Sequence, residues 1–258
     1  MASGTSEQKA AVDSALVDYV LALADDALIA SHRLGEWIAR APSIEEDVAV
    51  GNIGLDLLGQ ARSLLTYAGQ VEGSGRDEDA LAYLRDADAF CSAQLVERPN
   101  GDFAVAMVRL LLLGSYQVEL YSRLARSTDP TLAAVAAKAV KEVRYHRDHA
   151  TRWMIRLGDG TEESRSRVTA ALEAEWPYLA ELFDPVDPAL VESGVAVDPE
   201  SLRGPVRADL DAVLTEATLS VPDVDDAETG GRGAHSEALR ELLAEMQQLA
   251  RSHPGATW

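Results

Sequence analysis

Four long stretches of this chain carry apolar residues at intervals of three and four, the period of an amphipathic helix. They cover residues 12–40, 43–67, 102–126 and 130–157. Pro42 closes the first stretch and Asp129-Pro130 separates the last two, so each pair is joined by a short turn. A longer crossover, residues 69–100, lies between the pairs. This connectivity predicts a ferritin-like four-helix bundle with one long crossover.

Short polar signals mark the ends of these helices. Ser43 is followed by Glu46 at the third helical position, which is the pattern of a capping box. We expect Asp102 to cap the third helix, Pro130 to stand in the first turn of the fourth, and Gly158 to cap its C-terminus.

Three glycines, Gly51, Gly54 and Gly59, lie inside the second helix. Each costs about 1 kcal/mol relative to alanine in a helix interior. Two interpretations are open: a neighbouring helix approaches closely at these positions, or the glycines are tolerated weak points.

The rest of the chain is expected to form shorter helices and loops around the bundle. The expected helices are residues 77–96, 162–183 with a kink at Pro177, 199–219 and 236–252. The expected loops are residues 184–199 and 222–234. We therefore predict an all-α protein with a single domain, residues 1–258. It consists of a polar tail at 1–11, a core bundle at 12–158, and additional C-terminal helices at 159–258 that pack on the bundle.

The formal net charge of -20 limits the possible partners. A surface this acidic repels nucleic acid and anionic membranes, so neither is expected as a partner, although acidity also serves ordinary solubility. The most apolar run, residues 104–114, contains Arg109 and is too short to span a bilayer. One cysteine, Cys91, allows no intrachain disulfide, and no signal-peptide pattern is visible. A cytoplasmic protein is expected.

A carboxylate-bridged di-iron centre in such a bundle takes one Glu from each of two helices and Glu-x-x-His from each of the other two. The candidate positions here are Glu36, Asp56, Glu119, Glu142 and His146. Gly59 and Tyr145 stand where the two motif histidines belong. His146 comes one residue later than Tyr145, about 100° around the helix, so it does not simply replace the missing ligand.

Three interpretations of these degenerate positions are open. We expect a metal-free polar core, because an unpaired buried charge is very costly and the same helices offer basic partners. Those partners are Arg33, Arg62, Arg109, Arg123, Lys138 and Arg144. The second interpretation is a metal site that uses His146 and His149, and the third is simple exposure to solvent. No catalytic or cofactor-binding residue is expected, since no nucleophile elbow or phosphate-binding loop is present.

Six strings of residues are distinctive: Leu34–Trp37, Asn52–Arg62, Arg98–Phe103, Lys141–His146, Gly194–Pro199 and Leu243–Gln247. They resemble the family of C subunits of the phenylacetyl-CoA 1,2-epoxidases (the PaaC family), over nearly the whole chain. The resemblance implies a ferritin-like fold and a part in aerobic phenylacetate degradation. It also implies partners. A catalytic di-iron subunit forms a heterodimer with the PaaC-type chain, and this heterodimer pairs into a heterotetramer. The other partners are a small bridging subunit, and a reductase that uses NADPH, FAD and an iron-sulfur cluster.

From the residues and the resemblance together we expect a non-catalytic structural subunit with no cofactor of its own. The expected docking surface is the first two helices, with the face that carries Gly51, Gly54 and Gly59, together with Trp258 at the end of the chain. For Trp258, a frayed terminus is the other interpretation. Two alternative functions are a di-iron carboxylate oxygenase or oxidase in its own right, and a stand-alone helical storage or adapter protein.

Overall fold

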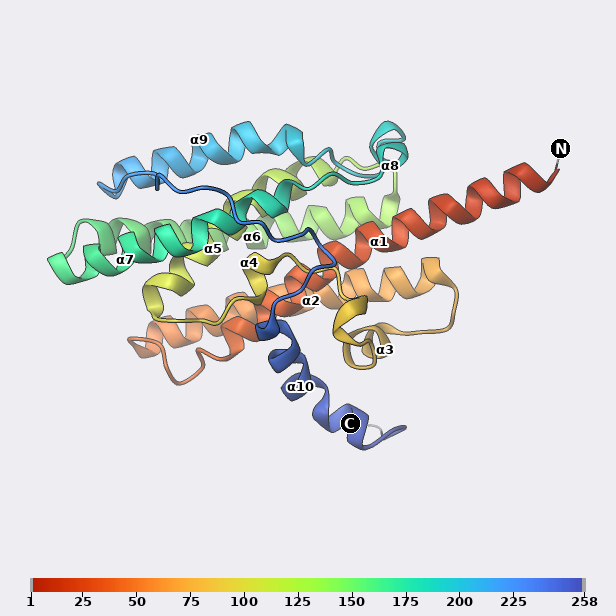
Figure 1. Ribbon diagram of the computed structural model, residues 1–258, viewed down its shortest axis with the longest axis horizontal. Coiled ribbons are helices and arrows are strands. Elements are labelled where there is room, and N and C mark those ends of the chain that lie inside the picture. The colour runs from red at the N-terminus through yellow and green to blue at the C-terminus, as the bar shows by residue number, and fades with distance from the viewer. Residues whose placement is uncertain (1, 257–258) are drawn as a thin grey trace.

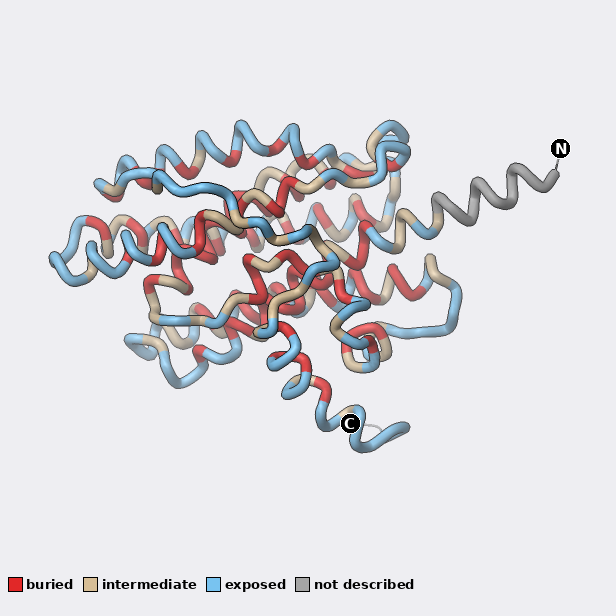
Figure 2. Tube along the Cα trace, viewed as in Figure 1, coloured by how far each residue is buried: buried red, intermediate tan, exposed pale blue. Residues whose placement is uncertain are grey.

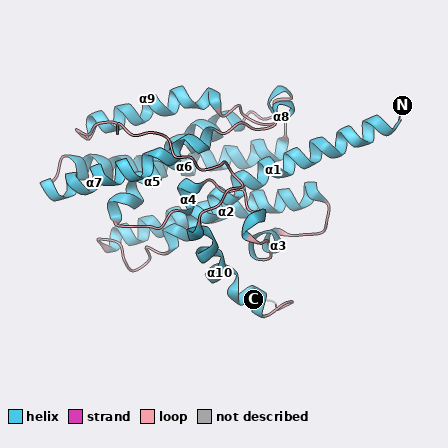
Figure 3. Ribbon diagram, viewed as in Figure 1, coloured by secondary structure: helices cyan, strands magenta, loops and turns pink. Residues whose placement is uncertain are grey.

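The computed structural model describes the backbone of residues 2–256 and the side chains of residues 13–256. Its regular elements are helices, and no strand occurs between residues 2 and 256 (Figure 3). The bundle consists of α1 (Ala2–Gly35), α2 (Ile44–Glu72), α5 (Phe103–Leu124) and α6 (Pro130–Gly158). Helix α1 packs along α2, α5 packs along α6, and α2 also contacts α6 (Figure 1). The predicted all-α, ferritin-like bundle is confirmed.

Side-chain caps begin three of these helices, and two of the caps, Ser43 and Asp102, are at the predicted residues. Ser43 accepts a hydrogen bond from the Glu46 amide at the start of α2, and Asp102 accepts one from the Val105 amide at the start of α5. Asp129 likewise caps the first turn of α6. Helix α6 includes Gly158, one residue beyond the predicted end.

Helix α1 differs from the prediction at both ends. It begins at Ala2, so the backbone of the expected polar tail is helical, because Glu7 to Ala11 are strong helix formers. The side chains of that tail lie outside the described residues. The helix ends at Gly35 rather than at Arg40. The turn that follows places Ala39 at a φ of 66°, and the Ala39 amide donates to the Asp47 carboxylate of α2.

The crossover is not the single helix predicted for residues 77–96. It is divided into α3 (Glu78–Tyr83), a 3-10 turn η1 (Ala87–Ala89) and α4 (Gln94–Glu97). Two buried carboxylates of α1 cause the division. Asp25 accepts a hydrogen bond from the Cys91 amide at 2.9 Å, and Asp26 accepts one from the Ala93 amide at 2.8 Å. These amides find their partners on α1, so the segment runs extended there instead of continuing as helix.

The C-terminal part adds α7 (Glu162–Glu175), the 3-10 segment η2 (Trp176–Phe183), α8 (Pro188–Glu192), α9 (Glu200–Glu216) and α10 (Glu237–Ser252). The α-helix predicted through residue 183 changes to 3-10 geometry at Trp176, directly before Pro177, which has no N–H to donate. The short α8 lies in a stretch predicted to be loop. Helices α7 and α9 cover α5, and their outer sides are exposed (Figure 2). Helix α10 contacts α3 and projects from the bundle (Figure 1), while Trp258 lies outside the described residues.

Helix α5 is the centre of the hydrophobic core. Met107, Leu111 and Leu112 are among its completely buried side chains. By length and composition α5 is the one helix of the described residues that could cross a membrane, and 78% of its most apolar stretch is buried inside the bundle. The buried Arg109 pairs with the carboxylate of Glu175 on α7, so the polar interruption in this helix is satisfied within the protein.

The glycines of α2 do not share one role. A Cβ on Gly54 would contact Leu34 and Ser31 of α1, so a neighbouring helix approaches closely at this position. A Cβ added to Gly51 would have no neighbouring atom within 4 Å. A Cβ added to Gly59 would contact only the end of the Lys138 side chain. The close-packing interpretation therefore holds for Gly54 alone. Much tighter glycine contacts lie at Gly69 of α2, which is against the Arg76 carbonyl, and at Gly158 of α6, which is against the Ala217 carbonyl after α9.

Candidate functional site

Three of the five degenerate ligand positions lie together between α2 and α6. His146 Nε2 lies 3.1 Å from an oxygen of Asp56, and the amide of Gln60 donates to Glu142 at 3.0 Å. Nζ of Lys138 also lies 3.4 Å from Oε1 of Glu142. The imidazole of His146 is buried, whereas Asp56 is 38% exposed. These residues form a polar seam between two helices, at the edge of the bundle.

The seam continues along α6 to His149. Nε2 of His149 lies 3.2 Å from a Glu46 oxygen but makes no hydrogen bond with it, and the same oxygen accepts from Trp153 Nε1 at 2.7 Å. Burial lowers the pKa of both His146 and His149. Both imidazoles therefore favour the neutral form.

Glu36 and Glu119 lie away from the seam. Glu36 follows the end of α1, is 40% exposed, and accepts hydrogen bonds from Arg33 and Asn100. Glu119 pairs with Arg123 one turn further along α5. The structure thus does not bring the five predicted residues into one polar core, because Glu36 lies beyond the end of α1 and Glu119 pairs with Arg123 on α5.

The positions of the missing histidines also lie at the surface. Tyr145 is 49% exposed, and Gly59 faces the tip of Lys138. Between residues 13 and 256 no group of three or more His, Cys, Asp or Glu side chains could hold a metal ion. The described residues therefore do not converge into the donor set of a di-iron centre.

Several buried charges were not expected from the sequence, namely those of Asp25, Asp26, Arg85 and Glu97. The completely buried Asp25 of α1 pairs with Arg85 of the crossover, where a guanidinium nitrogen lies 3.0 Å from the carboxylate. The neighbouring Asp26 pairs with both terminal nitrogens of Arg232. Both aspartates interrupt the apolar pattern of α1, and that interruption was the available signal.

Glu97 of α4 is the most densely bonded carboxylate among the described residues. It accepts from His235 at 2.7 Å, from Ser92, and from both the amide and the hydroxyl of Ser236. Burial opposes its ionisation, but these hydrogen bonds outweigh burial and lower the pKa of Glu97. The hydrogen bond to Glu97 raises the pKa of His235. This cluster connects the crossover to the segment that precedes α10.

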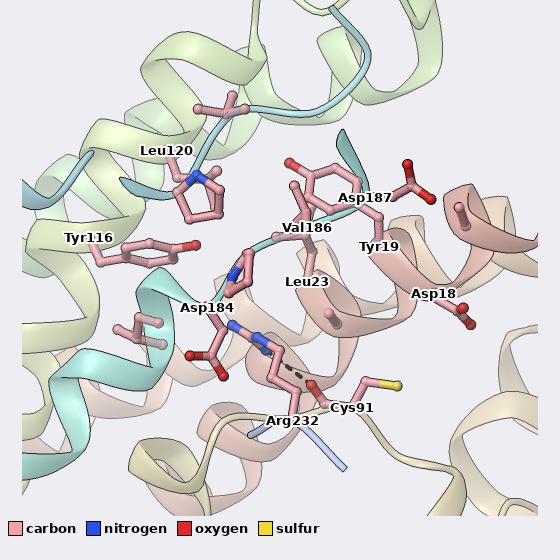
Figure 4. A pocket seen from close by; sticks show the side chains of 16 residues that line it. Asp18, Tyr19, Leu23, Cys91, Tyr116, Leu120, Asp184, Val186, Asp187 and Arg232 are labelled. Atoms are coloured by element: carbon pink, nitrogen blue, oxygen red, sulfur yellow. Dashed lines mark hydrogen bonds between the residues drawn. The ribbon is translucent and has the colours of Figure 1, made fainter. Parts of the chain in front are cut away.

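A cavity of about 290 Å³ lies between α1, α5 and the segment that contains α8 (Figure 4). Tyr19 and Tyr116 line it, and Arg232 reaches it from the C-terminal loop. Cys91 also lines it, and burial raises the pKa of its thiol to about 11, so Cys91 is not an activated nucleophile.

An apolar face is exposed on the outer side of α2 and α6. It consists of Ile44, Val48, Leu55 and Leu58 on α2 and Tyr145 on α6, which are 40–81% exposed. The described residues expose ten large apolar side chains, and five of them lie on this face. The exposed apolar residues are therefore clustered here and not spread evenly over the surface. We call it the α2–α6 face. The α2 members are spaced by four, seven and three residues, so they share one side of the helix.

Basic side chains border the α2–α6 face. Lys141, Arg144 and Arg152 of α6 are exposed, and none of them forms an ion pair among the described residues. In a chain with a net charge of -20, this border is locally positive.

Fold and site together define a class: a ferritin-like helical bundle whose described residues lack a converged set of metal ligands. The family model described as phenylacetic acid catabolic protein matches residues 1–258. The chain is 48% identical over 246 residues to the C subunit of 1,2-phenylacetyl-CoA epoxidase from Escherichia coli (strain K12), covering 94% of this chain and 99% of that protein. The chain belongs to the phenylacetic acid catabolic protein family.

Proposed function

We propose that this chain is a non-catalytic structural subunit of a phenylacetyl-CoA epoxidase in aerobic phenylacetate degradation. Its similarity to a protein named as the C subunit of that enzyme supports the assignment. In this proposal the di-iron centre belongs to a separate catalytic subunit, and this chain holds no cofactor.

One observation carries the non-catalytic part of the proposal. Gly59 and Tyr145 replace the motif histidines, and the remaining Asp56 and His146 bind each other. The chain therefore uses two of the expected ligand carboxylates, Asp56 and Glu142, in contacts between α2 and α6.

The proposed complex contains further components. The catalytic di-iron subunit forms a heterodimer with this chain, the heterodimer pairs into a heterotetramer, and a small bridging subunit joins these units. A reductase with FAD and an iron-sulfur cluster delivers electrons from NADPH and binds transiently. We place the complex in the cytoplasm.

We propose the α2–α6 face as the docking surface for the catalytic subunit. The expected docking face with Gly51, Gly54 and Gly59 needs revision, because Gly54 is buried against α1. The exposed stripe from Ile44 to Leu58 suits an apolar helical face, and the basic border on α6 suits a partner rimmed with carboxylates. A permanent interface of this kind buries more than about 2,000 Å².

Metal analysis tests the non-catalytic role. The chain is expressed together with the catalytic subunit, the complex is purified and its chains are separated, and iron is measured in each of them. We expect iron only in the catalytic subunit. Two iron atoms in this chain would instead support the alternative, a di-iron oxygenase or oxidase in its own right. If no complex forms, the structural role is refuted in favour of a stand-alone protein.

A further inference from the structure

A long loop between α9 and α10, residues 219–235, crosses the bundle (Figure 1), and we call it the strap. A few polar contacts attach it to the elements that it crosses. Its Ala227 amide donates to the Pro177 carbonyl of η2 at 2.9 Å. The side-chain amide of Gln94, at the start of α4, donates to two strap carbonyls, those of Thr229 and Ala234.

Arg232 attaches the strap to α1. Its two terminal nitrogens lie 3.0 and 2.8 Å from the two carboxylate oxygens of Asp26. One of these nitrogens also donates to the Cys91 carbonyl at 3.0 Å (Figure 4). Asp26 therefore occupies both terminal nitrogens of this guanidinium.

Glu181 of η2 is a buried carboxylate beside these attachments, and its residue is 3% exposed. One of its oxygens accepts from the backbone amide of Gln94 at 2.8 Å. The other oxygen, Oε1, is buried and has no hydrogen-bond partner among the described residues. Gln94 thus binds Glu181 through its backbone and the strap through its side chain. A buried charge with an unpaired oxygen is costly, so the environment of Glu181 disfavours its ionised form.

The charges around Glu181 do not offset its burial. Arg232 favours ionisation, whereas Asp26 and Asp184 oppose it, and the Asp184 carboxylate faces Gly231 of the strap. Burial has the largest effect and raises the pKa of Glu181 to about 7.

The other ionisable groups on the elements around η2 interact with partners of their own, remain neutral or are exposed. They are Glu175 with Arg98 and Arg109, Glu97 with His235, Arg203 over the Phe183 ring, Arg207 over the Trp176 ring, the protonated Tyr116, and the exposed strap residues Asp226 and Glu228.

We propose that Glu181 and the strap form a proton-controlled latch. With a proton on Glu181, no unpaired charge is buried and the strap stays attached to η2, α4 and α1. Loss of the proton leaves a third carboxylate near Asp26 and Asp184, and opening of the strap hydrates it. Ionisation of Glu181 therefore favours the open strap. The latch is independent of the α2–α6 face and of the structural role proposed above.

The direction of the effect follows from linkage. The pKa of Glu181 in the closed strap is raised above its ordinary value of 4.5, so the closed state loses stability as the pH rises from 4.5 to about 7. If opening returns Glu181 to its ordinary pKa, the opening equilibrium constant increases about tenfold between about pH 6.0 and 8.5.

Hydrogen exchange of the full chain tests the latch, with rates corrected for the intrinsic effect of pH. The amides of the strap, Ala227 above all, should exchange faster than those of the buried helix α5, because the strap opens without global unfolding. Glu181→Gln keeps the shape of the side chain without a charge. Relative to this variant, protection of the strap in the wild type should fall about tenfold between about pH 6.0 and 8.5.

The comparison with Glu181→Gln removes the contribution of His235, which ends the strap and also titrates. Glu173→Gln, at an exposed position of α7, is the control and should respond to pH like the wild type. The proposal is overturned if wild type and Glu181→Gln lose strap protection by the same factor, or if the strap exchanges only together with α5.

Discussion

Glu97 and His235 lie 138 residues apart in the chain, yet Oε1 of Glu97 is 2.7 Å from Nδ1 of His235. Both side chains are buried, with exposed fractions of 0% and 1%. His235 also contacts the Phe90 carbonyl through its other nitrogen, at 2.8 Å. This pair holds the beginning of α10 against the crossover, so two segments outside the four-helix bundle stabilise each other.

Replacing Glu97 should destabilise the protein strongly. Glu97→Gln removes the charge opposite His235 and converts one acceptor oxygen into a donor that faces the Ser236 amide. Removing one partner of a buried pair typically costs about 3–5 kcal/mol. Urea unfolding of the full chain measures this loss. The control is Glu237→Gln, in which the replaced side chain is 78% exposed and the change should stay within about 0.5 kcal/mol.

Stability should depend on pH through His235. The pKa of His235 is raised above its ordinary value of 6.5 by Glu97, so its contribution is complete below pH 6.5 and is lost as pH rises through the folded-state pKa. The pKa of Glu97 is lowered from 4.5, so the stability that ionised Glu97 contributes is lost only as the pH falls through this lowered pKa. The stability difference between wild type and His235→Gln should therefore be largest between about pH 4.5 and 6.5.

Unfolding measured at about pH 5.5, 7.0 and 8.5 for both proteins gives this difference directly. Subtracting the two curves removes the opposite trend of His146 and His149, whose lowered pKa values make stability rise with pH. A difference that is constant, or that grows towards the alkaline end of this range, would contradict the assigned pairing.

Alanine substitution should destabilise the protein at Gly158, where the backbone is tightly packed, but not at Gly51, where there is open space. Gly158→Ala places a Cβ against the Ala217 carbonyl, so α6 and the chain after α9 must move apart, at about 1–3 kcal/mol. Gly51→Ala meets no atom within 4 Å and should stabilise α2 by about 0.5–1 kcal/mol. Thermal unfolding of both variants tests the prediction, and equal shifts in Tm would refute the predicted contact at Gly158.

Charge on the α2–α6 face should weaken assembly without unfolding the chain. Leu55 is 65% exposed, so Leu55→Glu costs little within this chain but buries a carboxylate in the proposed interface. We expect affinity for the catalytic subunit to fall about 100-fold, which corresponds to roughly 3 kcal/mol. Leu84→Glu changes a leucine that is 60% exposed on another surface, after α3, and is the control.

Titration calorimetry with the purified catalytic subunit measures this binding. If Leu55→Glu binds it as tightly as the wild type does, the docking surface is wrong while the structural role stands. If the wild type itself does not bind, the structural role is wrong.

The four bundle helices were predictable because their signals are local. An apolar period of three to four residues and the caps Ser43, Asp102 and Asp129 act within one or two turns of the chain. The sequence also predicts degenerate ligand positions, because Gly59 and Tyr145 stand where the motif histidines are expected. The mutual pairing of Asp56 with His146 could not, because it depends on how α2 and α6 rotate against each other.

The amino-acid sequence was thus sufficient for the helices of the bundle and their connectivity. The identity of the buried charges emerged only from the folded chain. Asp25 with Arg85, Asp26 with Arg232, and Glu97 with His235 are each joined across at least 60 residues. The contacts of the two aspartates also divide the crossover helix. A helix period is a property of neighbouring residues, whereas the partner of a buried charge is fixed by packing between distant segments.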